Sequence, residues 1–276
     1  MSILYTAQQL TIYGGFFLLI NGIIGNGFNI FIFLVERNYR QIPSTFFFLI
    51  GSIVNTMHLL FNLGLRILSG SFGIDLTAKT VVLCKLRSSL LAAFGLISLT
   101  CICLASVDQF LATSRHQLIR KYSNIKWAHC IMLIMTLIWF GHSVPYAIFN
   151  TIINGVCVQT NIIYKDYTTY SFFVFFIGLP ILVLTIFGYL SYRNIHRIRI
   201  LVNQQADRQI TRMTLMQTIV VCLSILPYGI LSIYALVTNG TIKSLDQQMK
   251  EYFASAIINL ISYIHFSVSV LMLNST

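Results

Sequence analysis

The chain has 276 residues, of which 57% are hydrophobic and 9% are charged, and its formal net charge is +11. Soluble domains carry about 25% charged residues, so this composition excludes an ordinary soluble protein and indicates a surface covered by lipid. The basic residues lie in short loops between apolar runs, which argues against a nucleic-acid partner and is typical of a membrane protein.

Long apolar runs fill almost the whole sequence, and each can cross a hydrocarbon core of roughly 30 Å as an α-helix. We predict transmembrane helices over residues 10–35, 44–68, 84–112, 127–149, 170–192, 213–237 and 252–273. The expected fold is therefore an all-α membrane protein, a seven-transmembrane helix bundle that forms a single domain over residues 1–276. Pro180 and Pro227 lie inside the fifth and sixth runs, where each is expected to kink its helix.

The loops predict the orientation of this bundle, because 11 of the 18 basic residues follow the first, third and fifth runs. These residues are Arg37, Arg40, Arg115, Arg120, Lys121, Lys126, Arg193, Arg197, Arg199, Arg208 and Arg212. The positive-inside rule places them in the cytosol. The N-terminus is then expected outside and the C-terminus inside.

The third run carries the most informative motif. It begins at Cys84, and Asp108-Gln109-Phe110 follows twenty-four residues later. At 1.5 Å per residue this separation is about 36 Å, which puts the two ends at opposite membrane surfaces. The pattern resembles the third helix of rhodopsin-like (class A) G-protein-coupled receptors, in which Asp-Arg-Tyr follows a Cys at this distance. Here Gln109 and Phe110 stand in place of the Arg and the Tyr.

The resemblance extends over the whole layout and is greatest to divergent orphan or chemosensory-type receptors of invertebrates. It implies a receptor that transduces an extracellular ligand to a heterotrimeric G protein, located in the plasma membrane. Cys84 and Cys157 are the only cysteines that the predicted topology puts near the outer face. An oxidising exterior favours a disulfide between them.

Several polar residues occupy positions that the family uses in its core. Asn26 matches the Asn of a Gly-Asn pair in the first helix, and Ser98 matches a polar residue of the third. Asn55 stands where the family has the Asp that holds a sodium ion, so the resemblance implies that this ion loses its counter-charge. His265 precedes Ser269, which stands for the Asn of Asn-Pro-x-x-Tyr. We expect no metal and no cofactor.

The inner ends of the helices are expected to face the G protein. The residues assigned to this surface are Asp108, Gln109, Phe110, Arg115 and Asp207. In the family, an acid at the position of Asp207 pairs with the Arg that Gln109 replaces here. Gln109 carries no charge and cannot form this pair, and Arg115 is a possible substitute from the following turns.

The outer ends of the helices supply the candidates for a ligand pocket, which are Arg66, Arg87, Leu91, Tyr228, Tyr234 and Phe253. Leu91 stands where amine receptors of the family carry an Asp, so a cationic ligand is disfavoured. Arg66 and Arg87 suit a carboxylate or the C-terminal end of a peptide. Alternatively, both reach lipid headgroups or pair with Asp75.

The leading hypothesis is therefore a receptor for a peptide or a small anionic molecule, with membrane lipid and a G protein as its other partners. A transporter or channel subunit is one alternative, although the predicted spans hold no acid near mid-membrane. A receptor-like protein that no longer couples to G proteins is another, suggested by Gln109, Ile225 and Ser269. No nucleophile with its base stands out, so we do not expect an enzyme.

Overall fold

The structure is a computed structural model that describes residues 2–36, 39–72, 75–114, 116–197, 205–238, 241 and 243–268. Arg115 and Ser269, to which the sequence assigns roles, lie outside the described residues, as does the end of the seventh predicted span. Asp207 belongs to a described helix, but its side chain is outside the description.

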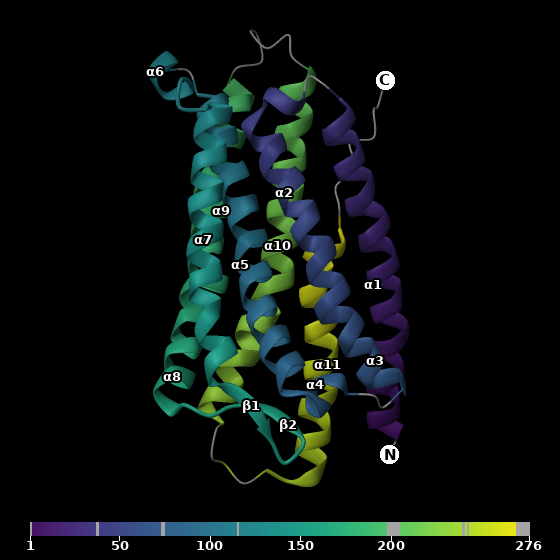
Figure 1. Ribbon diagram of the computed structural model, residues 1–276. Coiled ribbons are helices and arrows are strands. Elements are labelled where there is room, and N and C mark those ends of the chain that lie inside the picture. Colours follow the sequence, from purple (N-terminus) through teal and green to yellow (C-terminus); the bar gives the residue numbers. More distant parts are fainter. Residues whose placement is uncertain are drawn as a thin grey trace.

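Long helices run lengthwise side by side and form an elongated bundle (Figure 1). These long helices are α1 (Ser2–Val35), α2 (Pro43–His58), α5 (Val81–Ala112), α7 (Ile125–Phe149), α9 (Leu179–Arg197), α10 (Gln205–Val237) and α11 (Leu245–Ser267). The shorter helices are α3 (Gly64–Phe72), α4 (Leu76–Lys79), α6 (Gln117–Arg120) and α8 (Ile162–Ser171), with a 3-10 turn at Tyr39–Gln41. Helices α4 and α8 lie at the same end of the bundle as the N-terminus, and α6 lies at the other end (Figure 1).

Six helical stretches of the described chain are long and apolar enough to cross a membrane. They are Ile3–Val35, Pro43–Ser69, Val81–Ala112, Ile125–Phe149, Ile162–Asn194 and Arg212–Val237. Each of the first six predicted spans lies completely within one of these stretches. Helix α11 covers most of the seventh, but its first two turns carry Asp246, Lys250 and Glu251, and residues 269–273 are not described.

Helix α5 is the centre of the bundle. In its most apolar stretch 72% of the residues are buried, compared with 17–44% in the other five membrane-length stretches. Small side chains on α5 let its neighbours approach closely. A Cβ added at Gly95 would lie 2.7 Å from the ring of Phe176. On another side, Trp139 of α7 donates a hydrogen bond of 2.8 Å to Thr100, which satisfies a buried indole N–H.

Two π-helical segments interrupt the helices, at Leu59–Leu63 between α2 and α3 and at Phe172–Gly178 between α8 and α9. The second ends two residues before Pro180. Proline lacks an N–H and its ring crowds the carbonyl four residues earlier, and a wider turn relieves both problems. Pro227 lies within the continuous helix α10.

A short antiparallel hairpin follows α7 and departs from the predicted all-α fold. Strands β1 (Asn150–Ile153) and β2 (Val156–Gln159) pair with Ile152 opposite Cys157. The two turn residues, Asn154 and Gly155, have φ angles of 52° and 73°, as the favoured two-residue hairpin turn requires. This Asn-Gly pair between β-branched residues was a signal for a hairpin that the helix-based interpretation did not use.

Candidate functional site

The disulfide predicted from the sequence is present. Cys84 near the start of α5 is bonded to Cys157 of β2, and their Cα atoms are 5.6 Å apart. The bond ties the hairpin to the central helix at the end of the bundle where α4 and α8 also lie (Figure 1). The disulfide therefore fixes the position of the hairpin relative to α5.

The cavity has a volume of about 590 Å³ and lies among α5, α10, α11 and the α8–α9 region. This size is typical of a site for a small molecule. Its aromatic lining consists of Tyr146, Phe172, Phe173, Phe176, Tyr228, Tyr263 and Phe266. The ring of Phe172 stacks on that of Phe176 and meets that of Tyr228 edge to face, with centroids 5.3 Å apart in both pairs.

Two of the six predicted pocket residues line this cavity, namely Leu91 and Tyr228. Phe253 is not among the lining residues. Tyr234 is also outside the lining, and its hydroxyl instead donates a hydrogen bond of 2.7 Å to Glu251. Which aromatic side chains point inward depends on helix rotation, which the sequence did not reveal.

Arg66 and Arg87 do not line the cavity themselves, but their charges act on tyrosines in its wall. Arg66 of α3 interacts electrostatically with Tyr228 and Tyr263, and Arg87 of α5 interacts with Tyr263. The Nε atom of Arg87 is buried and has no hydrogen-bond partner among the described residues. Neither arginine forms an ion pair with a carboxylate in the described part of the chain.

The carboxylate of Asp75, the alternative partner for these arginines, is hydrogen-bonded to residues that directly follow it in the chain. Its Oδ1 atom accepts hydrogen bonds from the Thr77 hydroxyl at 2.6 Å and from the N–H groups of Thr77 and Ala78 at 3.0 and 3.3 Å. The hydrogen bond from the Thr77 hydroxyl is the main reason that the pKa of Asp75 is lowered, and the charge of Arg87 is the weakest contribution. Asp75 is thus a helix cap rather than a strong counter-charge.

Two buried histidines lie at the inner end of the cavity. His58 of α2 and His265 of α11 are each 4% exposed and both line it. Both rings pack against that of Phe266, with centroid distances of 3.9 Å for His58 and 3.7 Å for His265. His265 was predicted only as a core polar residue. Sequence reasoning noted His58 as a polar group within its span but did not place it at a ligand cavity.

The predicted core residues Asn26, Asn55 and Ser98 form contacts between helices. The Asn26 amide donates to the backbone carbonyl of Phe266 at 2.9 Å, which links α1 to α11. The Ser98 hydroxyl donates to Asn55 Oδ1 at 2.5 Å, which links α5 to α2. Asn26 and Asn55 also line a small cavity of about 20 Å³, enough for about one water molecule. The described residues contain no cluster of His, Cys, Asp or Glu that could hold a metal ion.

At the opposite end of α5, the predicted G-protein-facing residues Asp108 and Gln109 turn toward α2. Gln109 is 2% exposed, and its amide donates a hydrogen bond of 2.7 Å to the hydroxyl of Ser44. The Ser44 hydroxyl in turn donates to Asp108, which also accepts from the Ser123 hydroxyl at 2.7 Å. Ser44 and Ser123 were not predicted from the sequence, because a serine at the start of a helix or in a loop carries no signal for such a contact.

The third motif residue, Phe110, packs against α9, where its ring meets that of Phe187 edge to face with centroids 5.5 Å apart. The same end of α5, opposite the disulfide, continues to Thr113, whose hydroxyl accepts a hydrogen bond of 3.5 Å from Asn194 of α9. At this end of the bundle α2, α5 and α9 are therefore joined by polar and aromatic contacts that centre on the Asp-Gln-Phe motif.

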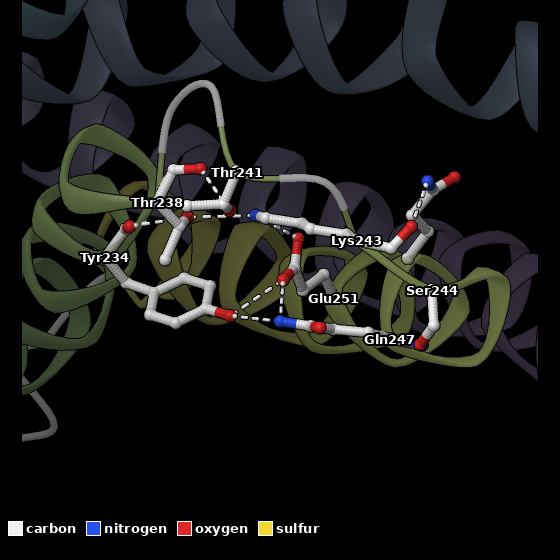
Figure 2. A network of polar contacts seen from close by, with 8 residues as sticks. Tyr234, Thr238, Thr241, Lys243, Ser244, Gln247 and Glu251 are labelled. Carbon is white, nitrogen blue, oxygen red and sulfur yellow. Dashed lines mark hydrogen bonds and ion pairs between the residues drawn. The ribbon is translucent and has the colours of Figure 1, made fainter.

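A polar network joins the ends of α10 and α11 beside the cavity (Figure 2). Lys243 forms an ion pair of 2.7 Å with Glu251 and a hydrogen bond of 2.9 Å with Thr238. Tyr234 and Gln247 also bind the Glu251 carboxylate. These contacts, the hydrogen bond from Lys243 first among them, lower the pKa of Glu251. The network therefore holds the end of α10 and the start of α11 together.

Helices of membrane-spanning length around a cavity, with a disulfide-linked hairpin at one end of the bundle, are typical of a transmembrane receptor. The chain matches the family model described as 7 transmembrane receptor (rhodopsin family) over residues 25–270. It belongs to this rhodopsin-like receptor family and is an integral membrane protein. The comparison with individual curated proteins gives no match. The family is not a family of enzymes, and in general its members couple to G proteins from within membrane lipid.

Proposed function

We propose that this protein is a receptor for a small molecule that carries an acidic group, and that it signals to a heterotrimeric G protein. The observation that carries the proposal is the charge around the cavity. Lys165 lines it, the charges of Arg66 and Arg87 act on Tyr263 in its wall, and no Asp or Glu is among its described lining residues. A carboxylate would form charge-assisted hydrogen bonds with the guanidinium groups.

The same charges argue against a cationic ligand. A buried positive charge needs a nearby opposite charge to offset its loss of hydration. Leu91 lies in the cavity wall and provides no negative charge. A peptide with a free C-terminus also carries a carboxylate and could bind in the same way. However, the cavity volume of about 590 Å³ is that of a small-molecule site and favours a small molecule as the ligand.

The proposed arrangement in the plasma membrane is a single domain over residues 1–276, with the N-terminus outside, the C-terminus inside and a seventh span over residues 252–273. The cavity then opens toward the exterior, and the Asp108-Gln109-Phe110 motif lies near the cytosol. An epitope tag at the N-terminus should be labelled on intact cells. Labelling that requires permeabilised cells would overturn this orientation and the outer position of the cavity.

The test of ligand class is a screen in cells that express the chain with a promiscuous G protein. The panel contains small carboxylic acids, their methyl esters, and peptides with free or amidated C-termini. We expect responses to acids that disappear with the esters. Responses confined to peptides with a free C-terminus would show that the peptide is the occupant.

Variants connect the response to the cavity. Arg66→Gln and Arg87→Gln should each weaken the response to an active acid by roughly tenfold or more, since a hydrogen bond to a charged group contributes about 1.5–3 kcal/mol. Lys250→Gln is the matched control. It also removes one positive charge, but Lys250 lies in an exposed ion pair with Asp246. Equal effects of all three variants would contradict the proposal. Binding of an acid without any G-protein response would identify the receptor-like alternative that does not couple.

A further inference from the structure

The inner end of the cavity contains hydrogen-bonding groups that the contacts within the protein do not use. Both ring nitrogens of His265 are buried and form no hydrogen bond of good geometry with the described residues, although the backbone of Ser262, one turn earlier, acts on the ring. Buried polar groups in proteins are nearly always paired, so at least one imidazole nitrogen at the cavity wall remains available for a ligand. A neutral imidazole has one N–H donor and one acceptor nitrogen, and it can therefore bind a hydroxyl from either side.

His58 provides a second group of the same kind. Its Nδ1 atom lies 3.4 Å from the side-chain amide of Asn62, and which of the two groups donates depends on the tautomer of the imidazole. In either tautomer this contact uses Nδ1, and Nε2 remains for a further hydrogen bond. His58 also interacts electrostatically with His265. The two rings that pack against Phe266 thus place donor and acceptor groups at one end of the cavity.

The two ends of the cavity differ in chemistry. Arg66 and His58 lie on the same helical rod, eight residues apart, which is about 12 Å at 1.5 Å per residue. The residues of α10 that line the cavity extend from Ile225 to Leu236, which is about 16 Å along the helix axis. Between the cationic end and the histidines, the wall is largely aromatic, with Phe172 and Phe176.

We propose that His265 and His58 form a neutral hydrogen-bonding subsite that binds a hydroxyl or carbonyl group of the ligand. This inference rests on the proposed function, because the acidic group of the same ligand would bind at the arginines. The ligand is then an amphipathic acid with an apolar middle and an oxygen function at its far end. The aromatic wall binds the middle, and the histidines select the oxygenated acid over its unsubstituted analogue.

The test uses the full chain in lipid nanodiscs and two probes, dodecanoic acid and its ω-hydroxy derivative, which differ only in the terminal hydroxyl. We expect the wild-type protein to bind the hydroxy acid about tenfold more tightly, which is the effect of one neutral hydrogen bond. His265→Phe keeps an aromatic ring but removes the nitrogens, and it should make the two affinities equal while the binding of dodecanoic acid is retained. His265→Gln keeps a donor and an acceptor and should restore part of the preference.

Two further variants complete the design. His58→Phe should also reduce the preference, so the result does not depend on the folding of one variant. His129→Phe is the control, because His129 is exposed and packs on Phe46 of α2, away from the cavity. It should leave both affinities unchanged.

The possible outcomes separate this inference from the proposed function. If the wild type binds both acids equally, the histidine subsite is wrong and the binding of acids stands. If neither acid binds, both are wrong. A preference for the hydroxy acid that survives in both His265→Phe and His58→Phe also overturns the subsite. Loss of the preference in these variants, with His129→Phe unchanged, supports it.

Discussion

The hydroxyl of Ser44 joins the start of α2 to the Asp-Gln-Phe motif, and its removal is the most direct test of this part of the structure. Ser44 is 0% exposed, donates a hydrogen bond to Asp108 and accepts one of 2.7 Å from Gln109. Ser44→Ala removes both bonds, and no water can replace them in a fully buried site. Asp108 keeps its bond to Ser123, so the loss is limited to these two contacts.

The expected cost follows from the two bonds. A hydrogen bond to a charged group contributes about 1.5–3 kcal/mol and a neutral one about 1 kcal/mol, so the free energy of unfolding should fall by roughly 2–4 kcal/mol. In chains of this size, 1 kcal/mol corresponds to about 2–4 °C, which predicts a decrease in the unfolding temperature of roughly 10 °C. Thermal unfolding of the purified protein in detergent, followed by a thiol-reactive dye, measures this decrease.

Ser224→Ala is the matched control for this experiment. Ser224 is 2% exposed, but its hydroxyl donates to the carbonyl of Val220 in its own helix at 2.7 Å. Such a bond within one turn adds little to the stability of a helix, so Ser224→Ala should change the unfolding temperature only slightly. If Ser44→Ala costs no more than Ser224→Ala, the contact between α2 and α5 does not stabilise the protein and the reasoning fails.

Three other predictions concern the disulfide, the polar network and the motif. Cys84→Ser and Cys157→Ser break one bond that spans 73 residues, which costs about 4 kcal/mol in the chain-entropy model, so surface expression should fall equally in both. The lowered pKa of Glu251 means that its stabilising effect is present above the ordinary pKa of glutamate and lost as the pH falls through the lowered value. The protection of amides around Lys243 against hydrogen exchange, expressed relative to the unfolded-chain rate at the same pH, should therefore fall on acidification in the wild type, whereas in Glu251→Gln it should be low at every pH. Gln109→Arg should increase ligand-driven activation of the G protein at matched surface expression, with basal activity unchanged or lower, and unaltered activation would contradict coupling through this position.

Local features of the sequence were sufficient for much of the fold. Hydropathy is a property of consecutive residues, so six membrane-length helices could be predicted before any contact was known. The disulfide was also accessible, because Cys84 and Cys157 were the only cysteines that the predicted orientation put on one side. The hairpin at Asn154 and Gly155 was missed, although its turn signal is equally local.

Tertiary structure decided which side chains meet. Ser44 and Gln109 are 65 residues apart in the chain, and their hydrogen bond depends on the rotation of two helices. The rotation of α10 likewise puts Tyr228 in the cavity wall and Tyr234 in the network with Glu251. In a membrane, apolar residues cover all sides of a helix, so the sequence has little amphipathic pattern to show which side faces inward. The sequence by itself therefore determined that the chain spans a membrane as a helical bundle, and only the packed bundle decided that His58 and His265 share a cavity.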